Sequence, residues 1–201
     1  MARLAFNKSA LHQQDAVLKT YQRFLPPLDM KRRQLMAEKN QAAHRLAHVE
    51  AELEKLLANV GPRLPMLADE SMDLKDLVTI AHLEVGTENL LATPLPVLRR
   101  LEVQRRQYSF LAKPHWVDQV AAELEQAVKL SVERQLAQSR LTQLEQAVRK
   151  ITQRVNLFEK VLIPRTEENI RRIQIYLADA ERAAVVRAKL AKERAVQRES
   201  L

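Results

Sequence analysis

The two ends of this chain carry long heptad patterns, and these constrain its fold more than any other feature. Between residues 4 and 56, apolar side chains fill twelve of the sixteen seam positions, the exceptions being Asn7, Gln14, Arg32 and Lys39. A second seam of the same kind runs from residue 130 to residue 162. Heptad seams are buried against a partner helix. We therefore predict that the two ends pair as a long antiparallel two-helix coiled-coil hairpin.

The composition agrees with a mainly α fold. The 201 residues include only two glycines, and aromatic residues make up 4% of the chain. A composition dominated by Ala, Leu, Glu, Lys, Arg and Gln is typical of long helices. We predict an N-terminal coiled-coil helix in 1–60, a central insert in 61–116 and a C-terminal coiled-coil helix in 117–201. The first helix is expected from Ala2 to Leu57, with Gly61 as a left-handed cap and Pro62 as a stop.

Prolines interrupt both predicted helices. Pro26 and Pro27 lie within the first, where the heptad register continues, so we expect one kinked helix. Pro164 lies within the second, where the seam spacing changes to four residues, a stutter that locally unwinds a supercoil. Pro164 is either a deliberate bend or a tolerated kink, and the accompanying stutter favours the bend.

The central insert carries the signal of a β-hairpin. Residues 77–85 are rich in branched side chains, and residues 97–103 alternate between apolar and polar. Pro94 and Pro96 mark an irregular connection or an edge strand. Because an isolated hairpin is only marginally stable in water, it must pack on the helices or on a partner. The candidate partner contacts are its apolar residues Val78, Ile80, Val97 and Leu101.

The chain lacks the residues that several classes of function need. The chain has no cysteine, which excludes thiolate chemistry, and no run approaching eighteen apolar residues. His44 and His48 lie four apart, a spacing that can bind zinc, but Arg45 stands between them and the metalloprotease glutamate is missing. We favour a solvated helix face there. We therefore expect no catalytic site, no metal and no cofactor.

The positive charge is concentrated at the two ends of the chain. Of the formal net charge of +8, residues 1–33 carry +5 and residues 165–201 carry +3, while 34–164 is balanced. An antiparallel hairpin would bring both basic ends together. A basic surface can attract nucleic acid without sequence specificity. Because no binding signature or aromatic stacking platform accompanies the charge, we expect no nucleic-acid partner.

Two stretches resemble a known family. Arg154–Pro164 reads RVNLFEKVLIP and is similar to the C-terminal signature of the D subunit of V-type (vacuolar/archaeal-type) rotary ATPases. Asn7–Leu11 and Leu28–Leu35 resemble that family's N-terminal helix. The sequence departs from the pattern at Ala178–Val186, which is rich in alanine where the family has a denser acidic stretch followed by an aromatic residue.

The resemblance implies a mechanical role. The D subunit is the central axle, or rotor stalk, of an ATP-driven proton or sodium pump or ATP synthase, and it is not catalytic. The implied partners are the hexamer of A and B subunits, the F subunit and the funnel-like lower-stalk subunit (C/d type). The implied location is cytoplasmic, in the soluble V1/A1 sector, with the membrane reached only through the rotor. The candidate residues for hexamer contact and register are Lys31, Arg32, Arg154, Asn156, Glu159, Lys160, Pro164 and Arg165.

Other interpretations remain open. An F-type gamma subunit or a secretion-system stalk would also use a coiled coil, although gamma subunits carry a larger α/β domain and secretion stalks lack the hairpin insert. A plain coiled-coil scaffold would tolerate changes at Pro164. At single positions, Asn156 either bonds across the helices or is a solvated polar residue, and Glu159 and Lys160 either contact the hexamer or only add solubility.

Overall fold

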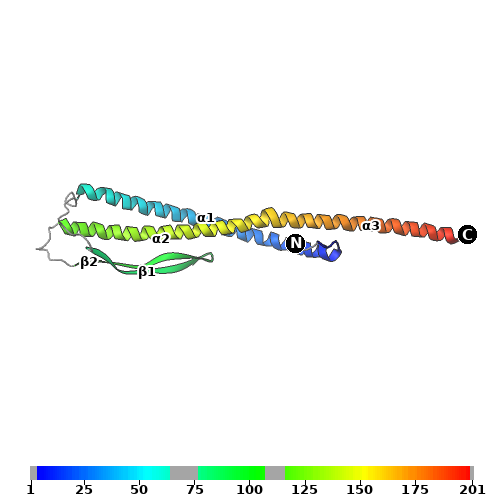
Figure 1. Cartoon of the computed structure of the whole chain (residues 1–201), viewed down its shortest axis with the longest axis horizontal. Coiled ribbons are helices and arrows are strands. Elements are labelled where there is room, and N and C mark those ends of the chain that lie inside the picture. Colours follow the sequence, from blue (N-terminus) through cyan, green and yellow to red (C-terminus); the bar gives the residue numbers. More distant parts are fainter. Residues whose placement is uncertain (1–3, 64–76, 107–115, 200–201) are drawn as a thin grey trace. The chain divides into compact units, whose positions relative to one another are not determined.

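The computed structural model describes residues 4–63, 77–106 and 116–199 of the chain (Figure 1). The elements are α1 (Lys8–Arg63), β1 (Val78–Leu90), β2 (Thr93–Arg105), α2 (Trp116–Leu157), a π-helical turn η2 (Phe158–Leu162) and α3 (Ile163–Glu199). This confirms a mainly α fold with long helices at both ends and a small antiparallel sheet between them. No helix in the described ranges is both long enough and apolar enough to cross a lipid bilayer.

The contacts within the chain divide it into two compact units. We call residues 1–31 with 151–201 the terminal unit, and residues 32–150 the central unit. α1 contributes to both units, and so does α2.

The ends of α1 differ from the expected ones. The amide of Ala10 donates a 2.7 Å hydrogen bond to Asn7 Oδ1, so Asn7 caps the helix and Lys8 begins it. At the other end the helix continues past Leu57 to Arg63, and no glycine in the described ranges has a positive φ. The prediction that Gly61 is a left-handed cap is therefore wrong. Pro62 lies in the last turn, where the helix ends one residue later.

α1 is a single helix through Pro26 and Pro27, as expected from the uninterrupted register. Both prolines are exposed. The kink at this point stays a prediction.

The central unit is built on a regular heptad seam. α1 buries one residue in every seven, and these are Leu35, Ala42, Val49 and Leu56. Ion pairs between α1 and α2 show the antiparallel order: Lys39 meets Glu145 at 3.4 Å, and Arg63 meets Glu123 at 3.6 Å. Lys39 interrupts the apolar seam in the sequence, and its pairing with Glu145 gives that charge a partner.

β1 and β2 form an antiparallel hairpin in the central unit, as predicted. Its two-residue turn is Leu91–Ala92, with φ of 51° and 60°. Tight hairpin turns of this kind need positive φ at both positions, which costs a residue with a side chain roughly 1–2 kcal/mol. Pro94 and Pro96 lie inside β2, where a two-stranded sheet leaves alternate amides without a strand partner.

The base of the hairpin is fixed by a small apolar core. Leu77, Val117 and Ala121 are almost fully buried together, and Val78 and Trp116 pack against them. Farther along β2, Leu95 is fully buried. Trp116 therefore serves as an anchor at the start of α2.

Candidate interaction surfaces

The stutter at Pro164 takes the form of a π turn in the terminal unit. The amide of Ile163 donates to the carbonyl of Phe158, five residues earlier. Proline at 164 has no amide hydrogen, and its ring crowds the carbonyl of the residue four positions before it. A π turn is wider than an α turn and is often found at functional sites. Thr166 is 6% exposed, and its hydroxyl donates a 2.7 Å hydrogen bond to the carbonyl of Leu162 just after this turn.

Aromatic and polar contacts join α1 to the C-terminal arm within the terminal unit. The rings of Tyr21 and Phe158 meet edge to face at 5.4 Å, so the first residue of η2 rests on α1. Asn169 Nδ2 donates a 3.4 Å hydrogen bond to Gln14 Oε1. Gln14 breaks the apolar seam in the sequence, and a polar partner opposite explains it.

The far end of the terminal unit is held by two weaker contacts. Phe6 lies against Tyr176 with 5.1 Å between ring centroids. Lys8 meets Glu181 at 3.7 Å, with both side chains well exposed. From residue 182 to residue 194, every side chain is exposed.

The residues predicted to contact the hexamer are mostly on the surface. Lys31, Arg32 and Asn156 are half-buried, and Asn156 makes no side-chain hydrogen bond to another described residue. Glu159 and Lys160 lie within η2 itself. The candidates that are exposed are Arg154, Glu159, Lys160, Pro164 and Arg165.

Exposed apolar side chains gather on the terminal unit, a feature that the seam analysis did not identify. Leu157 and Val161 are four residues apart, as are Val186 and Leu190, so each pair shares a helix face. The heptad pattern does not predict these residues because they lie outside the seam positions. The large apolar residues exposed on this unit are Phe6, Phe24, Met30, Leu157, Val161, Ile175, Tyr176, Val185, Val186 and Leu190.

The four hairpin candidates occupy different environments. Val78 packs into the core at the base of the hairpin, and Leu101 is half-buried. Val97 lines a cavity between the hairpin and the helices. Ile80 is the exposed member of the four, at 46%.

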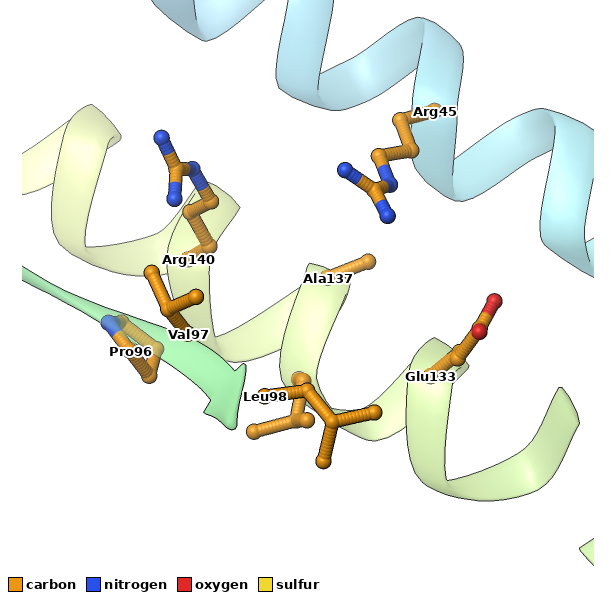
Figure 2. Close-up of a pocket in the computed structure, with 8 residues that line it drawn as sticks. Arg45, Pro96, Val97, Leu98, Glu133, Ala137 and Arg140 are labelled. Carbon is orange, nitrogen blue, oxygen red and sulfur yellow. The ribbon is translucent and has the colours of Figure 1, made fainter. Parts of the chain in front are cut away.

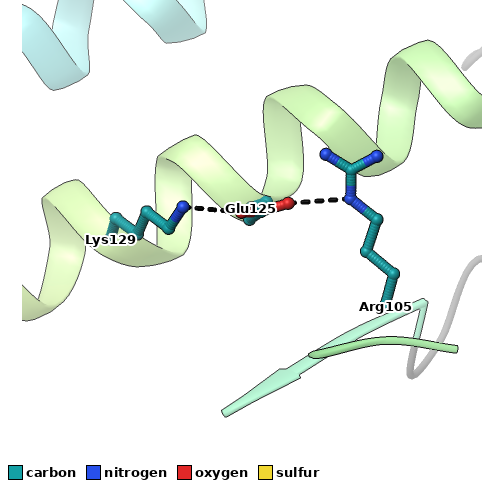
Figure 3. Close-up of polar contacts among 3 residues, drawn as sticks. All are labelled: Arg105, Glu125 and Lys129. Carbon is teal, nitrogen blue, oxygen red and sulfur yellow. Dashed lines mark hydrogen bonds and ion pairs between the residues drawn. The ribbon is translucent and has the colours of Figure 1, made fainter. Parts of the chain in front are cut away.

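Two ionic contacts hold the hairpin on α2. Glu125 accepts hydrogen bonds from Lys129 Nζ at 2.6 Å and from Arg105 Nε at 2.7 Å (Figure 3). Hydrogen bonding from Lys129 and then from Arg105 lowers the pKa of the Glu125 carboxyl below its ordinary value. Toward the tip of the hairpin, Arg140 donates to Glu88 at 3.1 Å.

The candidate residues form surfaces suited to protein contacts. Within residues 4–63, 77–106 and 116–199, no three His, Asp or Glu side chains lie close enough together to hold a metal ion. His48 lies 3.7 Å from Glu52, one turn along the same helix. Charged pairs, aromatic contacts and apolar faces of this kind suit the binding of other proteins.

Comparison with known proteins identifies the family. The family described as the D subunit of ATP synthase matches residues 10–193. The V-type ATP synthase D subunit of Borreliella burgdorferi is 30% identical to this chain over 200 residues, covering 98% of each protein. That of Chlamydia trachomatis serovar L2 is 31% identical over 179 residues, 87% of each, and that of Chlamydia abortus is 27% identical over 202 residues, 98% of this chain and 96% of the relative. Because the family match and these relatives span most of the chain, it belongs to the family of V-type ATP synthase D subunits.

Proposed function

We propose that this chain is the central rotor axle of a V/A-type rotary ATPase and transmits torque between the catalytic hexamer and the ion-translocating rotor in the membrane. In this role it carries no active site of its own. Its partners are the A and B subunits, the F subunit and the funnel-like lower-stalk subunit. It belongs to the soluble V1/A1 sector at the cytoplasmic face and reaches the membrane only through the rotor.

The observation that carries the proposal is the exposed apolar surface of the terminal unit in a member of this family. Exposed apolar side chains that share a helix face can pack against a partner protein. Leu157 with Val161 and Val186 with Leu190 are such pairs on the C-terminal arm. A hexamer that encloses the arm would cover them.

The charge distribution also supports placing the terminal arms inside the hexamer. The sequence segments that include the two terminal arms carry the whole excess of positive charge, +5 in residues 1–33 and +3 in residues 165–201. A summed charge of this size produces a potential of several kT near the surface and speeds the seating of a complementary partner. We therefore place the basic terminal arms inside the hexamer and the hairpin-bearing central unit on the rotor side.

Torque transmission needs helices that do not slide along each other. The contacts of Tyr21 with Phe158 and of Gln14 with Asn169 fix the register of the two arms. A π turn is one of the features that can bend a long helix. We propose that the π turn beside these contacts bends the C-terminal arm into an off-axis cam, so the Pro164 region matters for coupling.

The proposal is tested by co-purification with the A and B subunits, followed by ATP-driven ion pumping in membrane vesicles. We expect the chain to bind the hexamer, and we expect pumping to stop without it while some ATP hydrolysis continues. A Pro164→Ala variant is expected to assemble but to pump fewer ions per ATP. A stable hexamer that neither binds the chain nor needs it for pumping would refute the proposal.

A further inference from the structure

The β-hairpin is attached to the rest of the central unit at two separate places. At its base, the small apolar core fixes it to the start of α2. Toward its tip, Leu95 of β2 is fully buried, and Glu88 of β1 accepts a hydrogen bond from Arg140 of α2. Between the two attachments the strand pairing has two register shifts, the second of them between Glu84 and Val85. Because such irregularities disrupt a ladder locally and bend the strand, the tip half can move while the base stays attached.

A single cross-strand pair holds the tip half in place. Glu88 and Leu95 lie directly opposite each other in the hairpin, so their side chains share one face of it. This face is turned toward α2, because Glu88 reaches Arg140, and Val97, two residues along β2, lines a cavity with Ala137. The ion pair lies near the surface, where such pairs add little stability. The burial of Leu95 is therefore the main contact that keeps the tip on the helix.

The turn next to this pair is strained. Leu91 and Ala92 have φ of 51° and 60°, a region that crowds the β-carbon and is normally left to Gly, Asn or Asp. Strained backbone of this kind persists only where the surrounding structure holds it. The nearest such hold is the pair of Glu88 and Leu95, which lies three residues from the turn on each strand. The turn therefore depends on the docking of Leu95.

The packing beside the tip half is incomplete. A cavity of about 140 Å³ lies between this half and the helices, lined by Val97 and Leu98 of β2 and by Leu136 and Ala137 of α2 (Figure 2). A neighbouring cavity of about 260 Å³ extends to Glu88. Side chains that face empty space lose dispersion contacts that a dense interior would supply. The tip half is therefore held less firmly than a fully packed element.

We propose that the tip half of the hairpin, residues 86–97, is a strained latch with two states. In the docked state Leu95 is buried and the turn is held at positive φ. In the undocked state the tip leaves α2, Leu95 and Arg140 become exposed, and Leu91 and Ala92 relax out of positive φ. Because relaxation of the turn offsets part of the loss of Leu95 burial, undocking is a local opening that leaves the base and the helices folded.

The reactivity of a buried cysteine tests the latch in the full chain, which has no cysteine of its own. Leu95→Cys reports undocking, and Val117→Cys, equally buried but in the core at the base, is its control. We expect a thiol reagent to label Leu95→Cys at least tenfold faster than Val117→Cys. The Leu95→Cys rate should stay nearly constant in urea below the unfolding transition, because a local opening exposes little surface.

Relief of the strain in the turn should slow the opening. Leu91→Asn combined with Ala92→Gly supplies residues that favour positive φ. This pair of changes should slow the labelling of Leu95→Cys about tenfold, because the docked state is no longer strained. Thr87→Asn, on an exposed residue of β1 outside the turn, should alter the rate less than twofold. Amide exchange of residues 88–95 in the chain that keeps Leu95 should show the same slowing, which serves if Leu95→Cys itself loosens the tip.

Three results would overturn the inference. Equal labelling rates for Leu95→Cys and Val117→Cys, with equal dependence on urea, would mean that the tip opens only when the whole central unit unfolds. Labelling and amide exchange that do not respond to the turn substitutions would mean that strain does not drive the opening. Labelling of Leu95→Cys as fast as that of an exposed Thr87→Cys would mean that the tip does not dock.

Discussion

The two units of this protein distribute their apolar residues in opposite ways. Among the described residues, eleven of the fourteen buried apolar side chains lie in the central unit, and only Ile151, Val155 and Ile173 lie in the terminal unit. Of the sixteen large apolar side chains that are exposed, ten lie in the terminal unit. Most buried apolar residues therefore lie in the central unit, and most exposed large apolar residues lie in the terminal unit.

The difference indicates how each unit is stabilised. Burial of apolar surface contributes about 25 cal/mol per Å², so a unit with eleven buried apolar residues has its own core. The terminal unit has only three buried apolar residues among the described ones and so has only a small core of its own. Its stability therefore depends more on partner proteins that cover its helices. We infer that the central unit is stable by itself and that the terminal unit reaches full stability in the assembly.

The largest expected effect is on the central core. Leu144 is fully buried on α2, so Leu144→Ala should lower the free energy of unfolding by about 2–5 kcal/mol. Leu157→Ala changes the same residue type where it is 46% exposed and should cost less than about 0.5 kcal/mol. Urea denaturation of the full chain measures both. If both variants lost the same free energy of unfolding, the two units would not differ in how they bury their apolar residues.

The next effect concerns binding to the hexamer. Leu157→Asp places a charge on the exposed face of the terminal unit and should weaken binding to the A and B subunits by roughly 30-fold, about 2 kcal/mol. Leu57→Asp makes the same change in the central unit, at a leucine that is 60% exposed. It should alter the dissociation constant less than about twofold. If Leu57→Asp proved the more damaging, the central unit would be the one inside the hexamer.

A smaller effect is expected at the π turn. Thr166→Val removes a buried hydroxyl that bonds to the Leu162 carbonyl, at a cost of about 1 kcal/mol. Thr142 makes the same kind of bond to Gln138 at 2.9 Å but is exposed, so Thr142→Val is the matched control and should be nearly neutral. Thermal unfolding of both variants compares them. A neutral Thr166→Val would mean that this bond does not support the turn.

The smallest effect is a pH dependence of the hairpin. The pKa of the Glu125 carboxyl is lower in the folded state than its ordinary value of 4.5. The ionised carboxylate therefore stabilises the folded hairpin above about pH 4.5, and this stabilisation is lost as the pH falls through the folded-state pKa. Amide exchange in β2 should therefore speed up slightly as the pH falls below about 4.5, beyond the intrinsic change with pH. Glu125→Gln should remove this additional dependence. A wild-type response that persists in Glu125→Gln would assign it to another group.

The sequence predicts the regular parts of both units because they follow from periodicity. The seven-residue spacing of Leu35, Ala42, Val49 and Leu56 is confirmed as the buried face of α1. Two of the polar exceptions in that seam have partners that the sequence alone does not identify: Glu145 for Lys39 and Asn169 for Gln14. Asn7, a third exception, is the helix cap.

The irregular parts could not be predicted because they depend on contacts between distant residues. The turn at Leu91–Ala92 contains neither Gly nor Asn, the usual residues for positive φ. The stutter and Pro164 indicate an interruption, but only the structure shows a π turn with Phe158 against Tyr21. The pocket lined by Arg45, Val97 and Ala137 joins residues of three elements, and no local pattern in the sequence marks it.

If this chain turns inside the hexamer, its rotation can be observed in single molecules. The hexamer would be fixed to a surface, and a bead would be attached to a cysteine introduced at Thr87, an exposed residue of β1. On addition of ATP, the bead should rotate in one direction, at a rate that follows the rate of ATP hydrolysis. A bead that stays still while the hexamer hydrolyses ATP at its full rate would show that this chain is not the rotor axle.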